Sequence, residues 1–346
     1  MTMKKVRFGV VGTNFITDWV IAGAREDARF ELAAVCSRTR ERGEEFARKH
    51  GIPHVFTSLE DMTAGDTVDA VYIATPNCMH ARQSIYCMSR GKHVLCEKPM
   101  ASNAAEARAM IGASQRFGVT LMEAMKSTLS PNFRAVCENL RRVGRVRRYF
   151  ASFCQYSSRY DKFKEGTVLN AFRPELSNGA IMDIGVYAIY PAVVLFGIPR
   201  SIEAQGVVLS SGADGQGAVN MLYDGMNATV LYSKIADSLL PSEIEGEQGN
   251  ILVDRIQTPT DVRFYARTAP ASGRGARPEP EQLSVASGHD EYYYEIAEFI
   301  DLVLAGEVSS RVNSHAASLA VMEIVDEVRR QIGVHYPADD NPMLEM

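Results

Sequence analysis

Short apolar runs alternate with amphipathic segments over the first 123 residues of the chain. The runs with the composition of buried strands are Val6–Val11, Glu31–Cys36, Val68–Ala74, Val94–Cys96 and Val119–Met122. The segments with helical periodicity lie near 39–50, 78–90 and 102–117, and Gly51 is the expected C-cap of the first. Strands that alternate with helices predict a parallel, doubly wound α/β sheet, which we assign to a first domain of residues 1–126.

The pattern changes after Ser130 and Pro131, where strand-like runs follow one another with few helices between them. These runs are Val146–Tyr156, Ser201–Leu209, Gly217–Leu222, Ala228–Ser233, Ile251–Val253 and Asp261–Ala266. Residues 268–288 are rich in Pro, Gly and Ser and predict a loop, and two amphipathic helices close the chain. We expect a second α/β domain over residues 127–346, with a large, mostly antiparallel open sheet.

Composition and charge exclude several classes of protein. The chain has 346 residues, 46% of them hydrophobic, which fits two globular domains. The net charge of −5 gives no general attraction to polyanions, so we expect no nucleic-acid partner and read the arginines of residues 141–148 as a solvated face. The longest apolar run, Ala188–Ile198, is about half a membrane span, so we expect a core helix and no membrane association.

The six cysteines show no CxxC spacing. They are typical of reduced thiols in a cytoplasmic protein, without a disulfide or zinc framework. We therefore expect a cytoplasmic location and no metal site.

A lysine at the end of a predicted strand is the first candidate for chemistry. The stretch from Gly91 to Pro99 predicts a turn and a short strand that ends in Glu97 and Lys98. Ligands of open α/β sheets bind outside the carboxyl ends of the strands, and Pro99 restricts the conformation of Lys98. A solvated Glu–Lys pair at the strand end is the alternative.

The turn after the first strand has the position of a dinucleotide-binding loop. A pyrophosphate needs backbone N–H groups at a helix N-terminus and a turn without obstructing side chains. Of the G-x-G-x-x-G pattern only the first glycine, Gly12, is present, while Asn14 and Thr17 take the other two positions. Asn tolerates a positive φ, but its side chain narrows the approach to the phosphates.

Two further strand ends carry polar residues. Ser37, Arg38 and Arg42 follow the second strand, where an NAD site usually has an acid, so we favour NADP over NAD. Thr75, Pro76 and Asn77 follow the Val68–Ala74 strand and could line the ribose and nicotinamide. The alternatives are a plain turn in which Asn77 is a helix N-cap, and a surface position for His80.

Asp183 and Tyr187 lie on an otherwise apolar segment that begins near Ala180. On an α-helix these residues, at i and i+4, share one face. An acid and a phenol are costly to bury without partners, so they form either a hydrogen bond in the core or a catalytic pair that lines a cleft.

These stretches together resemble the Gfo/Idh/MocA family of NAD(P)-dependent oxidoreductases. Within that family the chain is similar to the branch of glucose–fructose oxidoreductase and dimeric dihydrodiol dehydrogenase. The resemblance is carried by Gly12–Ile16, Ala74–Asn77, Gly91–Pro99 and Gly179–Tyr187. It implies an N-terminal Rossmann domain, and a C-terminal domain whose open sheet mediates formation of a homodimer or homotetramer. Many members have His where this chain has Tyr187, and Lys126 stands where an aromatic residue is common in the dihydrodiol dehydrogenase branch.

The resemblance also implies roles for single residues. Lys98 is the catalytic lysine, Glu97 faces the nicotinamide ribose, and Asp183 and Tyr187 take the two polar active-site positions of the second domain. With these, the expected cofactor-binding residues are Gly9, Gly12, Thr13, Asn14, Phe15, Ile16, Ser37, Arg38, Arg42, Thr75, Pro76, Asn77, His80, Glu97 and Lys98.

The expected activity is hydride transfer between a nicotinamide cofactor, NADP with NAD possible, and a sugar, polyol or vicinal diol or the matching ketone. Tyr187 is the candidate proton donor in the reducing direction, and a nearby ammonium would lower the pKa of a phenol from its ordinary value of about 10. Two alternatives stay open: an NADP-binding regulator without catalysis on the same fold, and a glycosidase that uses the nucleotide as a recycled redox cofactor.

Overall fold

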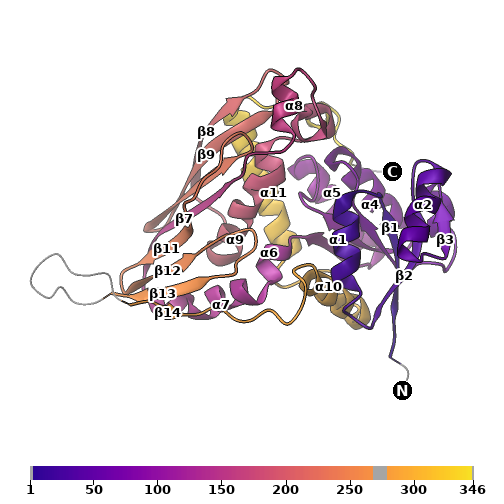
Figure 1. Cartoon of the computed structure of the whole chain (residues 1–346), viewed down its shortest axis with the longest axis horizontal. Coiled ribbons are helices and arrows are strands. Elements are labelled where there is room, and N and C mark those ends of the chain that lie inside the picture. Colours follow the sequence, from indigo (N-terminus) through magenta and orange to yellow (C-terminus); the bar gives the residue numbers. More distant parts are fainter. Residues whose placement is uncertain (1–2, 268–278, 345–346) are drawn as a thin grey trace, which may run out of the picture. The chain divides into compact units, whose positions relative to one another are not determined.

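The computed structural model describes residues 3–267 and 279–344 (Figure 1). By their internal contacts the residues form two compact units. The first comprises Met1–Lys126, Gly288–Met322 and Tyr336–Met346, and the second comprises Ser127–Ser287 and Glu323–His335. Residues 288–322 thus group with the first unit, whereas the sequence placed them in the domain of residues 127–346. The assignment of a cofactor domain and a substrate domain stays a prediction.

The first unit contains a six-stranded parallel sheet in the order β3-β2-β1-β4-β5-β6. Its strands are β1 (Val6–Val11), β2 (Phe30–Cys36), β3 (His54–Phe56), β4 (Ala70–Ile73), β5 (His93–Glu97) and β6 (Leu121–Ala124). The order reverses between β1 and β4, and ligands of open α/β sheets bind at such a switch point. The predicted doubly wound Rossmann sheet is therefore confirmed. The sequence analysis missed β3, which is only three residues long.

Helices of the first unit cover both faces of this sheet. They are α1 (Phe15–Ala24), α2 (Arg40–His50), α3 (Leu59–Thr63), α4 (His80–Ser89), α5 (Ala104–Phe117) and α10 (Tyr293–Ala305). Right-handed crossovers place α1 and α2 on one face and α4 and α5 on the other, because the strand order reverses between them. Helix α10 packs against α1, and its Phe299 lies 5.7 Å from the ring of Phe8 in β1.

Capping residues explain where these helices begin and end. The side chain of Thr39 accepts a hydrogen bond from the backbone N–H of Arg42 and starts α2. Gly51 ends the same helix in the left-handed region with φ of 67°, which confirms the predicted C-cap. Asn103 and Gly118 have the same two roles at the ends of α5.

The second unit contains an eight-stranded sheet in the order β14-β13-β12-β11-β7-β10-β9-β8. Its strands are β7 (Val146–Cys154), β8 (Ser201–Val208), β9 (Asp214–Tyr223), β10 (Met226–Ser233), β11 (Ser242–Gly246), β12 (Gly249–Val253), β13 (Val262–Ala266) and β14 (Glu281–Gln282). Among the described strand pairs of this second sheet only β7 and β10 are parallel, so the predicted mostly antiparallel sheet is confirmed. Strands β11 and β14 were not predicted, and residues 268–278 of the predicted loop lie outside the described residues.

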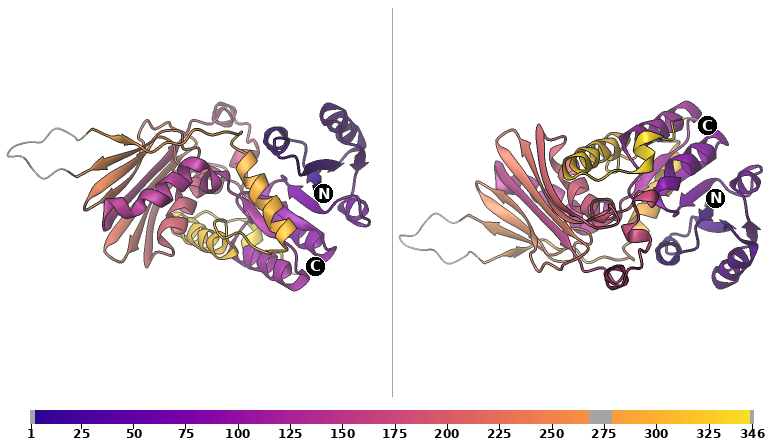
Figure 2. Two further views of the ribbon diagram at one scale, coloured as in Figure 1. Left: turned by 90° about the horizontal axis from the view of Figure 1, so that it is seen from below. Right: turned by 90° about the horizontal axis from the view of Figure 1, so that it is seen from above.

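Helices of the second unit pack beside one face of its sheet (Figures 1 and 2). Helix α7 (Pro131–Asn139) contacts β13, and α9 (Val186–Phe196) contacts β7 and β10. The end of α11 (His315–Ile332) is bound to β8, since the side chain of Gln331 accepts from the N–H of Ala204 and donates to the carbonyl of Ile202.

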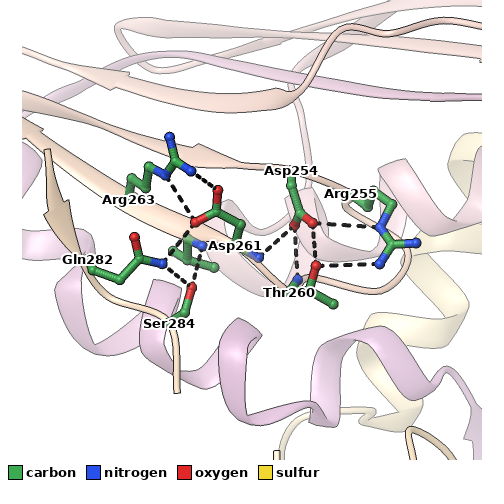
Figure 3. Close-up of polar contacts among 8 residues, drawn as sticks. Asp254, Arg255, Thr260, Asp261, Arg263, Gln282 and Ser284 are labelled. Carbon is green, nitrogen blue, oxygen red and sulfur yellow. Dashed lines mark hydrogen bonds and ion pairs between the residues drawn. The ribbon is translucent and has the colours of Figure 1, made fainter. Parts of the chain in front are cut away.

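A polar network fixes the edge of this sheet where β12, β13 and β14 meet (Figure 3). Asp254 Oδ1 accepts from the N–H groups of Thr260 at 2.9 Å and Asp261 at 3.0 Å, which closes the connection between β12 and β13. Asp261 in turn accepts from Gln282 at 2.8 Å and so holds β14 at the edge.

One helical stretch of the described chain, Pro174–Phe196, is long and apolar enough to cross a membrane, with 23 residues and a mean hydropathy of 1.8. Of its most apolar window 72% is buried inside the protein, and the core helix of a soluble protein passes the same test. The sequence analysis had interpreted the apolar run in this region as a core helix.

Candidate active site

Glu97 and Lys98 lie at the carboxyl end of β5, next to the switch point of the sheet. Glu97 is buried, and its carboxylate accepts from the hydroxyl of Tyr72 at 2.6 Å and from the backbone N–H of Lys98 at 3.2 Å. Burial raises the pKa of Glu97, while the Lys98 ammonium acts in the opposite direction. The alternative of a solvated Glu–Lys pair is therefore wrong for Glu97, which is 8% exposed.

His80 connects two of the strand ends. It is completely buried, with Nδ1 2.9 Å from the carbonyl oxygen of Pro99 and Nε2 2.9 Å from that of Thr75. Burial lowers its pKa, against the effect of these carbonyls. The alternative of a surface histidine is wrong, because His80 is buried. The local sequence does not reveal this burial, since the partners of His80 come from other segments. Its predicted cofactor contact stays a prediction.

The turn after β1 is built around Gly12. Its φ is +107°, and a β-carbon there would overlap the carbonyl oxygen of Ala74. Asn14 has an extended backbone with φ of −96°, so the tolerance of Asn for a positive φ is not used at this position. Asn14 caps α1 by accepting from the N–H of Ile16 at 2.9 Å, and its Nδ2 donates to Ala74 at 2.8 Å. Thr17 is also engaged locally, since its hydroxyl donates to the Gly12 carbonyl at 3.1 Å.

This geometry fits the pyrophosphate of a dinucleotide. No side chain projects from Gly12, the backbone comes close to the end of β4, and the turn leads directly into the N-terminus of a ten-residue helix. Gly9 lies under the turn, where a β-carbon would press on Met62 at 2.8 Å. Thr13, Phe15 and Ile16 continue the turn into α1.

The end of β2 carries the residues expected to bind a 2′-phosphate. Ser37 is buried and its N–H donates to Phe56 in β3 at 3.0 Å, whereas Arg38 and Arg42 are exposed. No carboxylate follows the strand before α2 begins at Arg40. The arrangement suits a phosphate better than a ribose hydroxyl.

The end of β4 differs from the sequence expectation in the place of Asn77. Thr75 Oγ1 donates to Gln83 Oε1 at 2.7 Å, and Pro76 is exposed. Asn77 is the first residue of a short 3-10 helix whose N-cap is Pro76, so the alternative of Asn77 as an N-cap is wrong. Its side chain is buried at this strand end.

In the second unit Asp183 lies within a π-helix, Ile181–Gly185, that leads into α9. The expectation that Asp183 and Tyr187 share one face rested on an α-helix with i, i+4 spacing. Because Asp183 lies in a π-helical turn, that α-helical spacing does not apply to this pair. Single π turns are frequent at functional sites. Asp183 forms an ion pair with Lys234, and the ring of Tyr187 packs edge-on against Phe153 with the centroids 5.7 Å apart.

Two glycines of this segment are required by packing. A β-carbon on Gly179 would overlap the carboxylate of Asp214, and one on Gly185 would lie 2.7 Å from Ile181 and 3.2 Å from the ring of Tyr232. Asp214 is completely buried and accepts from the N–H of Ile181 at 2.7 Å, so it anchors the start of the π-helix.

Sequence analysis missed several buried charged residues. Glu123 in β6 accepts from the N–H of Met100 at 2.9 Å, and burial raises its pKa to about 7. Glu295 in α10 is completely buried, and burial, reinforced by the charge of Glu97, raises its pKa well above the usual range. Lys126, which stands where an aromatic residue is common in the dihydrodiol dehydrogenase branch, pairs with Glu291 at 2.8 Å.

The side chains that could ligate a metal or form a disulfide are dispersed in the part of the chain that the structure describes. No group of three His, Cys, Asp or Glu in that part could hold a metal ion. All six cysteines are free thiols.

Together, the switch point, the Gly12 turn and the polar strand ends define a dinucleotide-binding α/β protein. The chain belongs to the Gfo/Idh/MocA family of oxidoreductases. Residues 6–125 match the family model described as oxidoreductase family, NAD-binding Rossmann fold, and residues 139–252 match the model of the GFO/IDH/MocA C-terminal domain.

Curated relatives match nearly the whole chain. Scyllo-inositol 2-dehydrogenase (NADP(+)) IolU of Bacillus subtilis (strain 168) is 49% identical over 334 residues, covering 96% of this chain and 99% of the relative. Trans-1,2-dihydrobenzene-1,2-diol dehydrogenase of Danio rerio is 31% identical over 347 residues, covering 96% and 99%.

Solved structures have the same fold. KijD10, a 3-ketoreductase from Actinomadura kijaniata in complex with NADP and TDP-benzene, has a TM-score of 0.80 at 25% identity, covering 95% of this chain and 98% of the other. Levoglucosan dehydrogenase in complex with NADH and levoglucosan has a TM-score of 0.82 at 20% identity, with the same coverage, and shows the fold alone.

Proposed function

We propose that this protein is an NADP-dependent dehydrogenase of a cyclic polyol, with scyllo-inositol as the first candidate substrate. The observation that carries the proposal is the 49% identity over 96% of the chain to a scyllo-inositol 2-dehydrogenase that uses NADP(+). The vicinal-diol dehydrogenases at about 30% identity act on a related group, a secondary alcohol beside a second hydroxyl on a ring.

The cofactor preference rests on the end of β2. Arg38 and Arg42 offer exposed guanidinium groups, and Ser37 offers a hydroxyl, at the position where an acid would select NAD. Gly12, Thr13, Asn14, Phe15 and Ile16 would hold the pyrophosphate at the start of α1. Thr75, Pro76, Asn77, His80 and Glu97 would line the nicotinamide and its ribose at the ends of β4 and β5.

We assign the chemical step to Lys98, Tyr187 and Asp183. Oxidation of the alcohol removes a hydride from the carbinol carbon and a proton from its oxygen, and leaves a ketone. When bound, the cofactor supplies the hydride acceptor. Tyr187, in its phenolate form, takes the hydroxyl proton and becomes the neutral phenol, Lys98 stabilises the negative charge on the alcohol oxygen, and Asp183 orients neighbouring hydroxyls of the ring.

The test is a substrate panel with both cofactors. Initial rates of nicotinamide reduction are measured with scyllo-inositol, other inositols, linear polyols and trans-1,2-dihydrobenzene-1,2-diol, and the ketone product is identified by mass spectrometry. Turnover of a ring polyol with NADP, and much slower turnover with NAD, supports the proposal. Turnover of trans-1,2-dihydrobenzene-1,2-diol alone would change the proposed substrate class from cyclic polyols to vicinal diols. Tight NADPH binding without turnover of any alcohol would favour the alternative function, an NADP-binding regulator without catalysis.

For the assembly we propose a cytoplasmic homodimer or homotetramer formed through the open sheet of the second unit. Val207 and Leu222, in β8 and β9, are 45% and 52% exposed, and both lie on the two strands at one edge of this sheet. Light scattering of the purified protein gives its mass in solution. If the V207E/L222E variant keeps the mass of the wild type, this surface is not the interface.

A further inference from the structure

Lys234 is a buried cation that neither the sequence nor the proposed mechanism explains. It follows β10, and its side chain is only 4% exposed. Taking an ammonium out of water is unfavourable unless a counter-charge compensates for the lost hydration. The counter-charge is Asp183, whose Oδ2 accepts from Lys234 Nζ.

The backbone of Lys234 is fixed on both sides. Its N–H donates to the carbonyl of Gly215 in β9 at 2.8 Å, and its own carbonyl accepts from the N–H of Ser157 at 2.9 Å. The ammonium also lies 5.8 Å from the centroid of the Phe172 ring. A lysine held in this way presents its charge at one place, unlike a lysine on a flexible surface segment.

The pair is asymmetric in its exposure. The Lys234 side chain is 4% exposed, whereas that of Asp183 is 33% exposed. The lysine side chain is therefore buried, while part of the Asp183 side chain remains accessible. A buried residue can in this way hold the orientation of a neighbouring group that is more exposed.

A second carboxylate, Asp214, holds the same helical segment. Asp214 is completely buried, and burial raises its pKa to about 6 while Lys234 acts in the opposite direction. Asp214 anchors the start of the π-helix through Ile181, and Asp183 lies within that helix. Asp214 thus anchors the start of the π-helix, while Lys234 pairs with the carboxylate that the same helix presents.

We propose that Lys234 is a positioning residue of the active site, which fixes the side chain of Asp183 in its working orientation through a buried ion pair. The inference rests on the proposed function, because it assumes that Asp183 orients the substrate. Lys234 itself then contacts neither substrate nor cofactor, and the effect of removing it is transmitted through Asp183.

The experiment is a double-mutant cycle in the full chain with scyllo-inositol and NADP. The variants are Lys234→Met, Lys234→Arg, Asp183→Asn and the double variant D183N/K234M. Lys162→Met is the matched control, since Lys162 belongs to the same unit and is 60% exposed in its pair with Glu165. For each protein we measure kcat, KM and the Kd for NADPH by fluorescence.

We expect K234M to lower kcat/KM about 10²-fold, the loss typical of a misplaced reacting group, with an unchanged Kd for NADPH. K234R should recover about tenfold of that loss, because it restores the charge. The double variant should lose no more than D183N alone, since both changes break one interaction. K162M should behave as the wild type.

Multiplicative losses in the double variant, or wild-type kcat/KM in K234M, would overturn the assignment of Lys234 alone. A wild-type protein without turnover of any polyol would overturn the proposed function and this inference together. If K234M does not fold, K234Q takes its place in the same cycle, with the same expected losses.

Discussion

Gly12 approaches the carbonyl oxygen of Ala74 so closely that any β-carbon on residue 12 would overlap that oxygen. The contact joins the loop after β1 to the end of β4, the two strands at the switch point of the sheet. The same carbonyl accepts a hydrogen bond from Asn14, so the loop is held to β4 at two points.

Replacing Gly12 with Ala should therefore disrupt the proposed cofactor site. The added methyl group forces the loop away from Ala74, at a residue whose φ of +107° already disfavours any side chain. We expect the Kd for NADPH to rise by at least about tenfold, as fluorescence titration would show.

Gly118→Ala is the matched control for this change. Gly118 also has a positive φ, of 63°, but nothing lies within 4 Å of a β-carbon there. It should lower the free energy of unfolding by about 1 kcal/mol and leave cofactor affinity unchanged. Equal cofactor affinity in G12A and the wild type would show that this loop does not belong to the cofactor-binding site.

Arg38 gives a test of the cofactor preference. If its guanidinium binds the 2′-phosphate, Arg38→Ala loses a charge-assisted hydrogen bond of about 1.5–3 kcal/mol. The KM for NADP should then rise about tenfold to 100-fold, while the KM for NAD changes little. Steady-state kinetics with both cofactors measure the ratio of the two KM values.

Arg40→Ala is the control, because Arg40 is also exposed, on α2, and pairs with Glu44 at 3.6 Å. A parallel rise in both KM values for R38A would show a general effect on the nucleotide.

Lys98 gives the test of the chemical step. Lys98→Met keeps the length of the side chain and removes the charge that stabilises the alcohol oxygen. We expect kcat to fall about 10²–10⁴-fold, with little change in the Kd for NADPH. Stopped-flow measurement of the hydride-transfer step separates this loss from product release. Lys92→Met is an informative comparison, since Lys92 precedes the same strand and donates to the Gly65 carbonyl at 2.8 Å. Wild-type turnover in K98M would refute the assignment.

Elements whose side chains carry their own signal could be predicted from the sequence. Val6–Val11 forms β1 with the predicted limits, since a continuous apolar run bounded by a glycine has few other solutions. The ends of α2 follow from Thr39 and Gly51 in the same way. The polar strand ends could be listed as candidates because parallel strands bring their carboxyl ends to one edge.

Other features depend on partners that are distant in sequence. The Asp183–Lys234 pair joins residues 51 positions apart, so a spacing argument limited to one helix could not find it. The π-helix around Asp183 is apolar on almost every side, and its composition does not distinguish it from an α-helix. His80 reads as a surface residue until the carbonyls of Thr75 and Pro99 are known to enclose it.

Glu123 should make the stability of the protein depend on pH. It is 1% exposed, and burial raises its pKa to about 7 in the folded protein, from an ordinary value of 4.5. Between these two values the folded state retains a proton that the unfolded chain has lost. The free energy of unfolding contributed by this residue therefore falls as pH rises from about 4.5 to about 7, and the change amounts to about 3 kcal/mol.

Glu123→Gln removes this titration while keeping an oxygen that can accept from the N–H of Met100. Urea-induced unfolding, measured across the same pH range, should show E123Q gaining stability relative to the wild type as pH rises, with the difference levelling off above about pH 7. Glu138→Gln removes the same charge from an exposed position on α7 and serves as the control. A difference between E123Q and the wild type that stays constant across the range would mean that folding does not raise the pKa of Glu123.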